Sequence, residues 1–361
     1  APAGGRARGG PAVRPPGVTA GPHRDRAAFV VNSGSGTVTP VDLRTKRADP
    51  AIRVGARPTA IVASPDGRML YVADSGASEV TPVNPVTRRA GAPIRVGRDP
   101  RALAITPDGR TLYVADSGSG TVTPVSTRTG RAGRPIPVGR YPRSIAMSKD
   151  GKTAYVLDWG SGQVTPIRVR GNRPGRPVSV GGYPVAAAFA PGGGTLYVAS
   201  FGADTVTPVN LTTGRAGRPA RVGAAPDALA VTPDGRTVYV VSGDRSTLTP
   251  ISTASWRPGR PVRVGYAPAA IAMSRTGTRM YVVGTISGTV TPVGVASGRP
   301  GHAIQVGRYT YPTVIATDPR GLLAVVLGTY AGSVRLIDTR TDRASGSVRT
   351  GAGPVAVAFA G

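Results

Sequence analysis

Short apolar stretches alternate with polar turns along almost the whole chain, and the alternation recurs every 42 residues. The stretches are rich in β-branched and aromatic residues, as in Leu70-Tyr71-Val72, and the turns are rich in Gly, Pro, Asp and Ser. This composition is typical of strands joined by tight reversals. A Val-Thr-Pro tripeptide, once Leu-Thr-Pro, marks each repeat, and its proline stands at Pro40, Pro82, Pro124, Pro166, Pro208, Pro250 and Pro292. The pattern predicts strands throughout and indicates no helix.

Each 42-residue cassette predicts four strands. Strand A follows a Val-Gly and a proline, as at Pro58, and a Pro65-Asp66-Gly67 turn leads to strand B at Leu70. A Ser-Gly loop precedes strand C around Val80, and a longer loop precedes strand D at Ile94-Arg95-Val96. Four strands in this length is the spacing of a β-propeller blade. The predicted fold class is therefore all-β, with a single β-propeller.

The two ends of the chain complete one blade. The sequence supplies strands B, C and D from about Ala27 onward and finishes with a lone strand A, Val355-Ala356-Val357-Ala358. Joining them leaves no strand edge unpaired. Seven complete cassettes and this composite one predict eight four-stranded blades over residues 27–361. The small residues of strand A, such as Ala102 and Ala104, share one face, where we expect them to fit the crowded axis of a ring.

Proline inside strand C predicts a defect in its pairing with strand D. Proline lacks an N–H and normally avoids inner strands, so we expect the ladder between strands C and D to be broken or bulged there. An eighth, degenerate copy of the motif ends at Leu336 and follows an insertion at Tyr309-Thr310. That copy has no proline to interrupt the ladder.

The amino-acid composition limits the catalytic and metal-binding chemistry that the chain can carry out. The chain of 361 residues has 45 basic and 18 acidic residues, a formal charge of +27, and no cysteine. The absence of cysteine excludes disulfides, thiolate metal sites and cysteine nucleophiles. The only two histidines, His23 and His302, are too sparse for a catalytic triad or a histidine metal site. We therefore predict no enzyme activity, no catalytic residue, no metal and no cofactor.

Two further features concern location. No apolar run is long enough to span a bilayer, so membrane insertion is not expected. Residues 1–26 are rich in Gly, Pro and Arg and predict a disordered tail. The chain begins Ala1-Pro2-Ala3, which we interpret as the start of a secreted protein whose leader has been removed.

The cassette resembles the YVTN-type β-propeller repeat of bacterial and archaeal extracytoplasmic proteins. The matching elements are the Pro-Asp-Gly turn, the Val-Gly before strand A and the Tyr-Val of strand B. The Tyr-Val pairs are Tyr71-Val72, Tyr113-Val114, Tyr155-Val156, Tyr197-Val198, Tyr239-Val240 and Tyr281-Val282. The resemblance implies a secreted or cell-surface binding role, and it makes seven blades the family-typical alternative to eight.

One face of the predicted ring collects the loops that vary between cassettes. If strand A runs downward, the D-to-A and B-to-C loops share the top face. The candidate binding residues lie there, over the third and fourth complete cassettes, and are Arg140, Tyr141, Arg143, Asp158, Trp159, Tyr183 and Phe201. Arginine beside aromatic rings is typical of binding interfaces, although such rings also serve to pack loops together.

Carboxylates end strand B in three successive cassettes, at Asp74, Asp116 and Asp158. Such residues commonly cap a turn. A full ring of them would suit a cation, but later cassettes have Ser or Gly at this position, so the ring is incomplete.

The C-to-D loops predict a basic belt on the opposite face. Its residues are Arg131, Arg134, Arg173, Arg176, Arg215, Arg218, Arg257 and Arg260. A run of charges often forms only a solvated face. This belt has one sign and recurs from cassette to cassette, so we expect a strong positive potential that attracts polyanions.

These features favour a secreted, non-catalytic binding scaffold whose partner is a protein or an anionic surface polymer. Two alternatives remain open. A nucleic-acid-binding propeller would use the basic belt, although stacking aromatics are not repeated along it. A propeller enzyme, a lyase or hydrolase, would use the top-face carboxylates.

Overall fold

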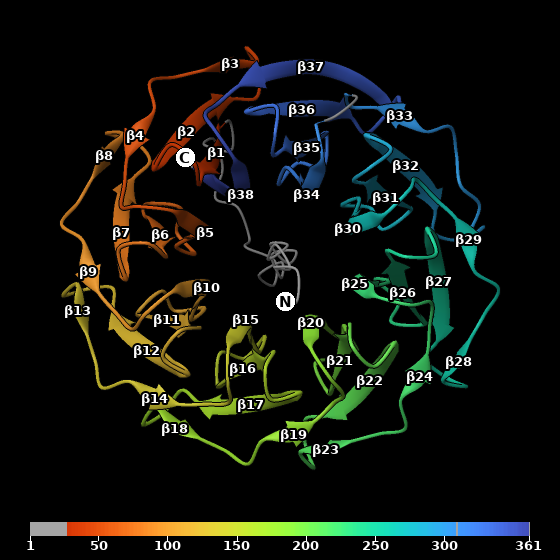
Figure 1. The fold of residues 1–361 in the computed structure, drawn as a ribbon, viewed down its shortest axis with the longest axis horizontal. Coiled ribbons are helices and arrows are strands. Elements are labelled where there is room, and N and C mark those ends of the chain that lie inside the picture. Colours follow the sequence, from red (N-terminus) through yellow and green to blue (C-terminus); the bar gives the residue numbers. More distant parts are fainter. Residues whose placement is uncertain (1–26, 308–309, 361) are drawn as a thin grey trace, which may run out of the picture.

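The structure, a computed structural model, describes residues 27–307 and 310–360. The described residues contain strands and turns and no helix, and they form eight antiparallel sheets arranged as a ring (Figure 1). Each sheet is one blade, with strand A nearest the axis and strand D at the circumference. The predicted all-β propeller with eight four-stranded blades is confirmed.

The inner two strands of each blade follow the repeat of the sequence. Strand A of blades 2 to 8 is β5 (Pro58–Ala63), β10 (Pro100–Ile105), β15 (Pro142–Met147), β20 (Pro184–Phe189), β25 (Pro226–Val231), β30 (Pro268–Met273) and β34 (Pro312–Thr317). Strand B is β6 (Leu70–Asp74), β11 (Thr111–Asp116), β16 (Thr153–Asp158), β21 (Thr195–Ser200), β26 (Thr237–Ser242), β31 (Arg279–Gly284) and β35 (Leu323–Gly328).

The outer strands differ in continuity. Strand C is β7 (Glu79–Asn84), β12 (Thr121–Ser126), β17 (Gln163–Arg168), β22 (Thr205–Asn210), β27 (Thr247–Ser252), β32 (Thr289–Gly294) and β36 (Ser333–Asp338). Strand D of blades 2 to 6 has two short pieces, β8 (Arg89–Ala90) with β9 (Ile94–Arg95), β13 (Arg131–Ala132) with β14 (Ile136–Pro137), β18 (Arg173–Pro174) with β19 (Val178–Ser179), β23 (Arg215–Ala216) with β24 (Ala220–Arg221), and β28 (Arg257–Pro258) with β29 (Val262–Arg263). Blade 7 has β33 (Ile304–Gln305), and blade 8 has the single strand β37 (Arg343–Arg349).

Blade 1 closes the ring from both ends of the sequence. It combines β38 (Pro354–Ala360) with β1 (Ala27–Asn32), β2 (Thr37–Asp42), β3 (Arg47–Ala48) and β4 (Ile52–Arg53). In the middle of β1, Val30 pairs with Val357 on one side and with Thr39 on the other. The composite blade is confirmed, and the family-typical count of seven blades is wrong for this chain.

The hydrophobic core is divided among the interfaces between blades. At the interface of blades 3 and 4, Ala102 and Ala104 of β10 lie in one cluster with Ile145 and Met147 of β15. A small residue on one blade therefore receives a large one from the next. The alanine pattern arises from this packing between blades, and not from crowding at the axis alone as we had expected. Burying such an Ile or Met stabilises the fold by about 1.5–3 kcal/mol.

In blades 3 and 7, the tyrosine of the Tyr-Val motif links its blade to the next one. The Tyr113 hydroxyl donates to Asn172 Oδ1 at 2.6 Å, and the Tyr281 hydroxyl donates to Asp342 Oδ1 at 2.8 Å. In both cases the acceptor lies in the C-to-D loop of the next blade. The motif therefore has a structural role.

The predicted defect between strands C and D is confirmed. In blade 3, β13 and β14 pair with the two ends of β12, and the ladder is interrupted between them at Pro124. The Pro124 carbonyl accepts from Gly133 N at 2.7 Å and therefore points toward strand D. The N–H and C=O of a residue in an antiparallel strand point to the same side, so the N–H that proline lacks would also have faced strand D. In blade 8, where Leu336 replaces the proline, β37 pairs along the whole of β36 with one bulge.

Candidate functional site

Hydrogen bonds between loops define the two faces of the ring. In blade 2, Ser75 N donates to Arg57 O at 3.1 Å and Gly76 N donates to Ala56 O at 2.9 Å, which joins the B-to-C loop to the D-to-A loop. We call the face bearing these loops the top face. In blade 3, Thr127 N donates to Arg110 O at 3.1 Å, so the C-to-D loop and the A-to-B turn share the bottom face. The predicted sharing of faces by these loops is confirmed.

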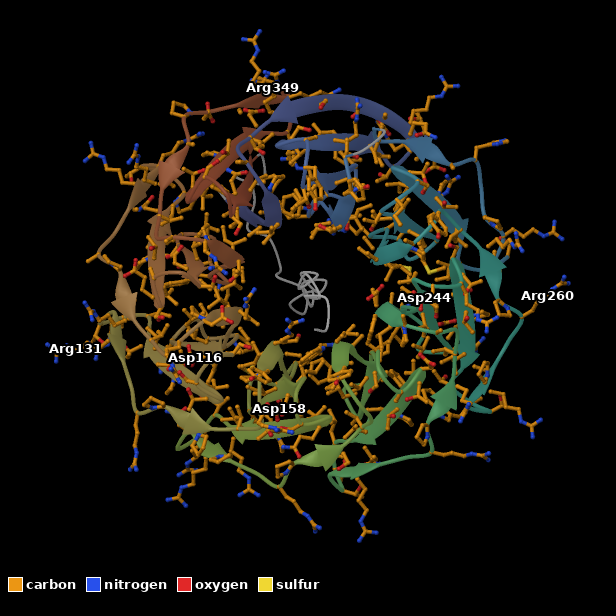
Figure 2. The ribbon with its side chains drawn as sticks, in the orientation of Figure 1. Asp116, Arg131, Asp158, Asp244, Arg260 and Arg349 are labelled. Atoms are coloured by element: carbon orange, nitrogen blue, oxygen red, sulfur yellow. The ribbon has the colours of Figure 1, made fainter. Side chains whose placement is uncertain are left out.

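Asp158 is a buried structural residue, which corrects its assignment as a surface binding residue. Its side chain is fully buried, and Thr165 Oγ1 donates to its Oδ2 at 2.5 Å. A Cβ built on Gly139 would lie 2.6 Å from Asp158 Cβ, so the glycine of the Val-Gly motif is needed to cover the carboxylate. Asp116 has the same environment one blade earlier. Figure 2 labels both residues.

The three strand B carboxylates share one electrostatic situation. Burial raises the pKa of Asp74, Asp116 and Asp158 to about 6, against the lowering effect of a threonine hydrogen bond. In each, Oδ2 is bound and Oδ1 is buried without a partner among the described residues. Within residues 27–307 and 310–360, no group of three potential metal ligands forms. These carboxylates therefore join strands rather than converge on a common ligand.

Three of the predicted top-face residues do come together. The rings of Trp159 and Tyr183 stack with centroids 4.4 Å apart, and the Arg143 guanidinium lies 4.6 Å from the Trp159 ring centroid. Tyr141, Tyr183 and Phe201 are 55%, 45% and 39% exposed. The exposed Arg140 donates to Gly160 O at 3.2 Å. Trp159 thus packs between loops, whereas Tyr141, Tyr183 and Phe201 keep ring surface that a partner could contact. Each of the two interpretations of these rings is correct for part of the group.

Two of these tyrosines occupy a costly backbone conformation. Tyr141 and Tyr183, each just before strand A, have φ of 51° and 57°. Gly353 occupies the corresponding place in blade 1 with φ of 66°, where no side chain is strained. A bulky residue in this region costs about 1 kcal/mol or more. The other blades have the same positive φ at this place, so the conformation belongs to the repeat and is not specific to the tyrosines; the residues there are Arg57, Asp99, Ala225, Ala267 and Tyr311.

The basic residues lie farther out than we had expected. All eight predicted arginines are exposed and lie in the segments that carry strand D, which forms the circumference. Arg131 and Arg260 extend outward from the ring (Figure 2). The belt therefore runs around the rim and not across the bottom face. We call Arg131, Arg134, Arg173, Arg176, Arg215, Arg218, Arg257 and Arg260 of blades 3 to 6 the basic arc.

The basic arc has no compensating acid nearby. Strands C and D of blades 3 to 6 and the loops between them contain no Asp or Glu. None of the eight arginines forms an ion pair with another described residue. This single sign over four adjacent blades creates a positive potential at the rim.

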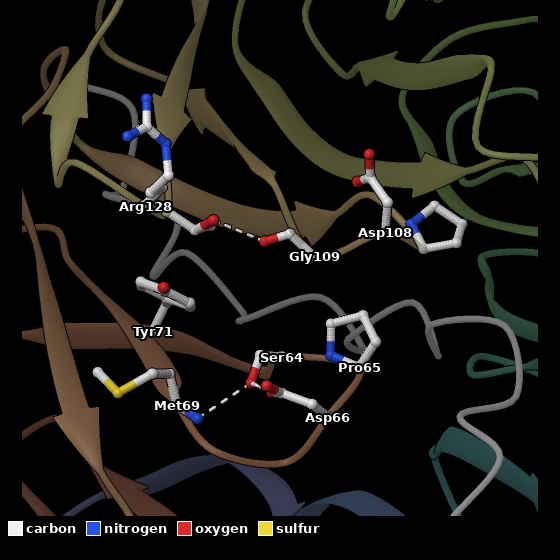
Figure 3. A pocket seen from close by; sticks show the side chains of 10 residues that line it. Ser64, Pro65, Asp66, Met69, Tyr71, Asp108, Gly109 and Arg128 are labelled. Carbon is white, nitrogen blue, oxygen red and sulfur yellow. Dashed lines mark hydrogen bonds between the residues drawn. The ribbon is translucent and has the colours of Figure 1, made fainter.

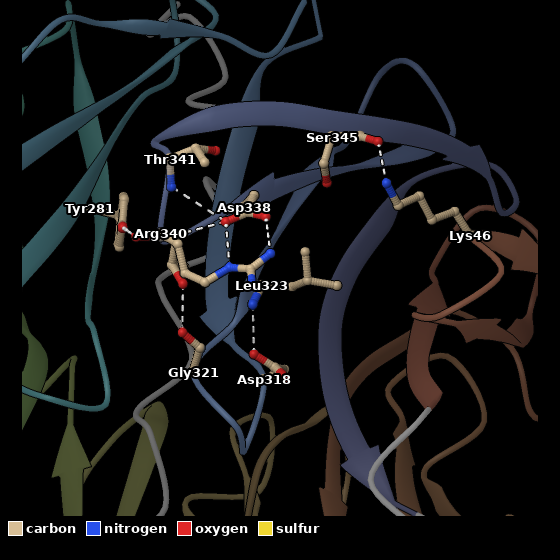
Figure 4. Close-up of polar contacts among 10 residues, drawn as sticks. Lys46, Tyr281, Asp318, Gly321, Leu323, Asp338, Arg340, Thr341 and Ser345 are labelled. Carbon is tan, nitrogen blue, oxygen red and sulfur yellow. Dashed lines mark hydrogen bonds and ion pairs between the residues drawn. The ribbon is translucent and has the colours of Figure 1, made fainter.

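On the rest of the rim, acids pair with some of the arginines. Others, such as Arg53 and Arg349, have no ion pair with a described residue, and blade 7 also has no acid in strands C and D. Arg88 of blade 2 pairs with Asp49 of blade 1, Arg279 of blade 7 with Asp342 of blade 8, and Arg340 with Asp338 within blade 8. The last pair is 2.9 Å long (Figure 4). Lys46 of blade 1 donates to Ser345 O at 2.7 Å and ties blade 1 to blade 8 (Figure 4). We call this stretch, defined by Arg88, Arg279, Arg340 and their partners, the paired arc.

A recess on the bottom face was not found from the sequence. It has a volume of about 480 Å³ and lies between blades 2 and 3 (Figure 3). Its lining is Ser64, Pro65, Asp66, Met69, Tyr71, Pro107, Asp108, Gly109, Thr127 and Arg128. Ser64 Oγ donates to Asp66 Oδ1 at 2.6 Å, so this carboxylate is occupied with its own turn. One feature of the sequence could have indicated the recess. Asn172, which accepts from Tyr113, is replaced one repeat earlier by Gly130, so Tyr71 has no comparable acceptor.

Comparisons with known proteins agree with the fold and leave the function open. Residues 27–135 match the family model described as Lactonase, 7-bladed beta-propeller, which is less than half of the chain. No curated protein matches the sequence. In the described part of the chain there is also no helix long and apolar enough to cross a membrane.

Many solved structures are similar to this chain, and three of them illustrate the range. Kuenenia stuttgartiensis hydrazine synthase is 23% identical with a TM-score of 0.64, over 79% of this chain and 96% of that chain. The dihydro-heme d1 dehydrogenase NirN in complex with DHE is 16% identical with a TM-score of 0.80, over 94% and 75%. A functionally unknown protein from Desulfotomaculum acetoxidans DSM 771 is 16% identical with a TM-score of 0.61, over 77% and 95%. At these identities the likeness shows the β-propeller fold alone.

Proposed function

We propose that this protein is a non-catalytic scaffold that binds an extended anionic polymer along the basic arc. The observation that carries the proposal is the set of eight exposed arginines that no carboxylate of the described chain neutralises. Their recurrence at the same positions of four blades gives a curved row of charge. A polymer with regularly spaced anions matches such a row better than a compact ligand does.

The energetics also favour a polymer. A single exposed ion pair contributes about 0–1 kcal/mol, so one arginine binds a small anion weakly. Several contacts with one polyanion release several condensed counterions together, and affinity then depends steeply on salt. The exposed arginines of the arc gain most of their binding free energy in this way.

The resemblance to YVTN-type repeats supports a place outside the cytoplasm, where anionic surface polymers occur. That location stays a prediction. A non-catalytic role is supported by the strand B carboxylates, which are buried and hydrogen-bonded to Thr81, Thr123 and Thr165.

Retention on immobilised heparin tests the proposal. Reversing Arg131, Arg134, Arg173 and Arg176 to Glu should abolish retention at about 0.15 M salt. The matched control reverses Arg53, Arg95, Arg343 and Arg349, which are also exposed rim residues and give the same change in net charge. The control should still be retained. Equal loss in the two variants would show that only net charge matters and would overturn the arc as the binding surface.

A second binding experiment, with DNA, tests the alternative that the partner is a nucleic acid. Duplex DNA and a carboxylated polymer of similar charge density should be bound by the same arc with comparable salt dependence. Aromatic platforms for bases do not recur along it, and Trp256 stacks on Tyr197 instead, with ring centroids 5.3 Å apart. Selective binding of single-stranded nucleic acid would make nucleic acid the partner.

A lactone-cleaving enzyme is the second candidate, because residues 27–135 match a lactonase family model. Turnover of a lactone panel by repurified protein tests it. Asp116→Asn and Asp158→Asn should leave any background rate unchanged. Loss of a real turnover rate in either variant, with the fold intact, would replace the scaffold proposal by an enzyme.

A further inference from the structure

Two neighbouring blades place arginine at the same position of strand A. Arg101 of β10 and Arg143 of β15 each follow the proline that starts the strand. The corresponding residues of the other blades are Thr59, Val185, Asp227, Ala269, Thr313 and Val355. Strand A is the innermost strand of its blade and begins at the top face, so Arg101 and Arg143 lie near the top of two neighbouring inner strands. Blades 3 and 4 are thus distinguished by a pair of adjacent cations.

This pair shares one carboxylate. Asp99 Oδ1 is 2.9 Å from Arg101 Nε, and both side chains are partly exposed. Burial and then the positive charge of Arg101 lower the pKa of Arg143, while Asp99 opposes this effect. Arg143 is therefore close to another cation and has no carboxylate of its own among the described residues. An added anion would relieve the repulsion between the two guanidiniums.

Arg143 is held in place by aromatic packing. Its guanidinium lies against Trp159, which stacks on Tyr183. A cation–π contact fixes the plane of the guanidinium without using its N–H donors. No hydrogen bond from the Arg143 side chain to another described residue is formed. The donors are positioned in advance for a planar, bidentate acceptor such as a carboxylate.

The surroundings offer apolar surface next to these donors. Tyr141 and Tyr183 follow one another in adjacent blades and are 55% and 45% exposed. Half-exposed rings provide flat faces for the C–H face of a sugar, which gains from leaving water. A ligand that joins a carboxylate to such a face is a uronic acid.

We propose that Arg101 and Arg143, with the Trp159–Tyr183 stack, form a binding site for the carboxylate of a uronic acid residue. This inference rests on the proposed function, because it names the polymer as a carboxylated polysaccharide. The basic arc would hold the chain by charge along blades 3 to 6. The top-face site, on blades 3 to 5, would select the carboxylated sugar.

Calorimetry with a galacturonic acid trimer tests the site apart from the arc, because at about 0.3 M salt a trimer gains little from distributed charge. The trimer should bind, and its fully methyl-esterified form should not. Arg143→Gln should reduce affinity by roughly tenfold or more, as expected for the loss of a charged hydrogen-bond pair. Arg57→Gln removes the same charge from an exposed arginine of another top-face loop, outside the site, and should change the affinity by no more than about twofold.

Asp99→Asn gives a test in the opposite direction. It removes the carboxylate that competes for Arg101 and should raise trimer affinity several-fold. Thermal melting of each variant establishes that the fold is retained. Equal binding of the methyl ester or of a phosphorylated sugar, or unchanged binding by Arg143→Gln, would overturn the site.

The basic arc and the uronate site can be refuted separately. Reversal of Arg131, Arg134, Arg173 and Arg176 should leave trimer binding unchanged while abolishing polymer retention. Polymer retention by a protein that does not bind the trimer would refute the uronate site and leave the basic arc standing. Trimer binding without any effect of arc reversal on the polymer would refute the arc instead.

Discussion

The two arcs of the rim are built from the same repeat and differ in how their charge is compensated. In the paired arc, Asp49, Asp338 and Asp342 each bind a nearby arginine. In the basic arc, the corresponding cassettes have no acid in strands C and D or the loops between them. A general bias toward arginine would affect both arcs alike. The repeat therefore tolerates compensating acids at these positions in blades 1 and 8, and blades 2 to 7 lack them.

Lowering the pH protonates the buried carboxylates of the interior and leaves the arginines of the rim charged. Of the changes proposed, it has the largest expected effect on stability. Burial raises the pKa of Asp116 from its ordinary value of 3.8 to about 6, so the native state binds this proton more tightly than the unfolded chain does. Stability should therefore rise as pH falls from about 7 to 4, by up to about 3 kcal/mol for this residue. Arginine keeps its charge throughout this range, so polyanion binding should not change.

Asp116→Asn checks this directly by thermal melting. Blade 1 already has Asn32 at this position, where Nδ2 donates to Thr39 Oγ1 at 2.8 Å. The variant should be more stable than wild type at pH 7.5 and similar to it near pH 4. A variant less stable at pH 7.5 would mean that the ionised carboxylate contributes net stability.

Compensating the basic arc should make it resemble the paired arc. Ser126, Asn210 and Ser252 stand where blades 1 and 8 have Asp42 and Asp338. Asn210 Oδ1 already accepts from Thr212 N and Thr213 N, as Asp42 Oδ1 does from Arg44 N and Thr45 N, so aspartate suits the turn. The triple Asp variant should bind polyanions roughly tenfold more weakly at low salt. Unchanged affinity, measured by fluorescence anisotropy, would contradict the importance of local compensation.

The converse change should extend the basic arc by a smaller amount. Asp49→Asn, Asp338→Asn and Asp342→Asn together release three arginines from their pairs. Asn172 accepts from Tyr113 as Asp342 does from Tyr281, so Asn preserves that contact between blades. Polyanion affinity should rise by about two- to fivefold, with a steeper dependence on salt. A fall in affinity with an intact melting transition would mean that the polymer does not follow the rim.

The architecture could be predicted from the sequence because each feature of the repeat depends on residues close together in the chain. The Val-Thr-Pro spacing gave the blades, the complementary ends gave the closure, and proline inside strand C gave the broken ladder. The reasons behind two patterns required the structure. The alanines of strand A match Ile145 and Met147 of the next blade, and the Val-Gly glycine covers Asp158, and both relations join residues far apart in the sequence.

The candidate site was predictable only in part. The exposure of Tyr141 and Tyr183 follows from their place in variable loops. The burial of Asp158 and the ion pair of Arg101 with Asp99 depend on how adjacent loops fold over one another. The position of the basic residues at the rim follows from their place in the segments that carry strand D, the outermost strand of each blade. No spacing in the sequence reports these relations.

The most direct test of the basic arc is the slope of log affinity against log salt concentration for a defined polyanion. About six contacts predict a slope of about −4 to −6 for the wild-type protein. Reversal of Arg131, Arg134, Arg173 and Arg176 to Glu should bring the slope close to zero. Reversal of Arg53, Arg95, Arg343 and Arg349 should change it by about one unit or less. The same shallow slope in all three proteins, or the same loss in both variants, would contradict the account.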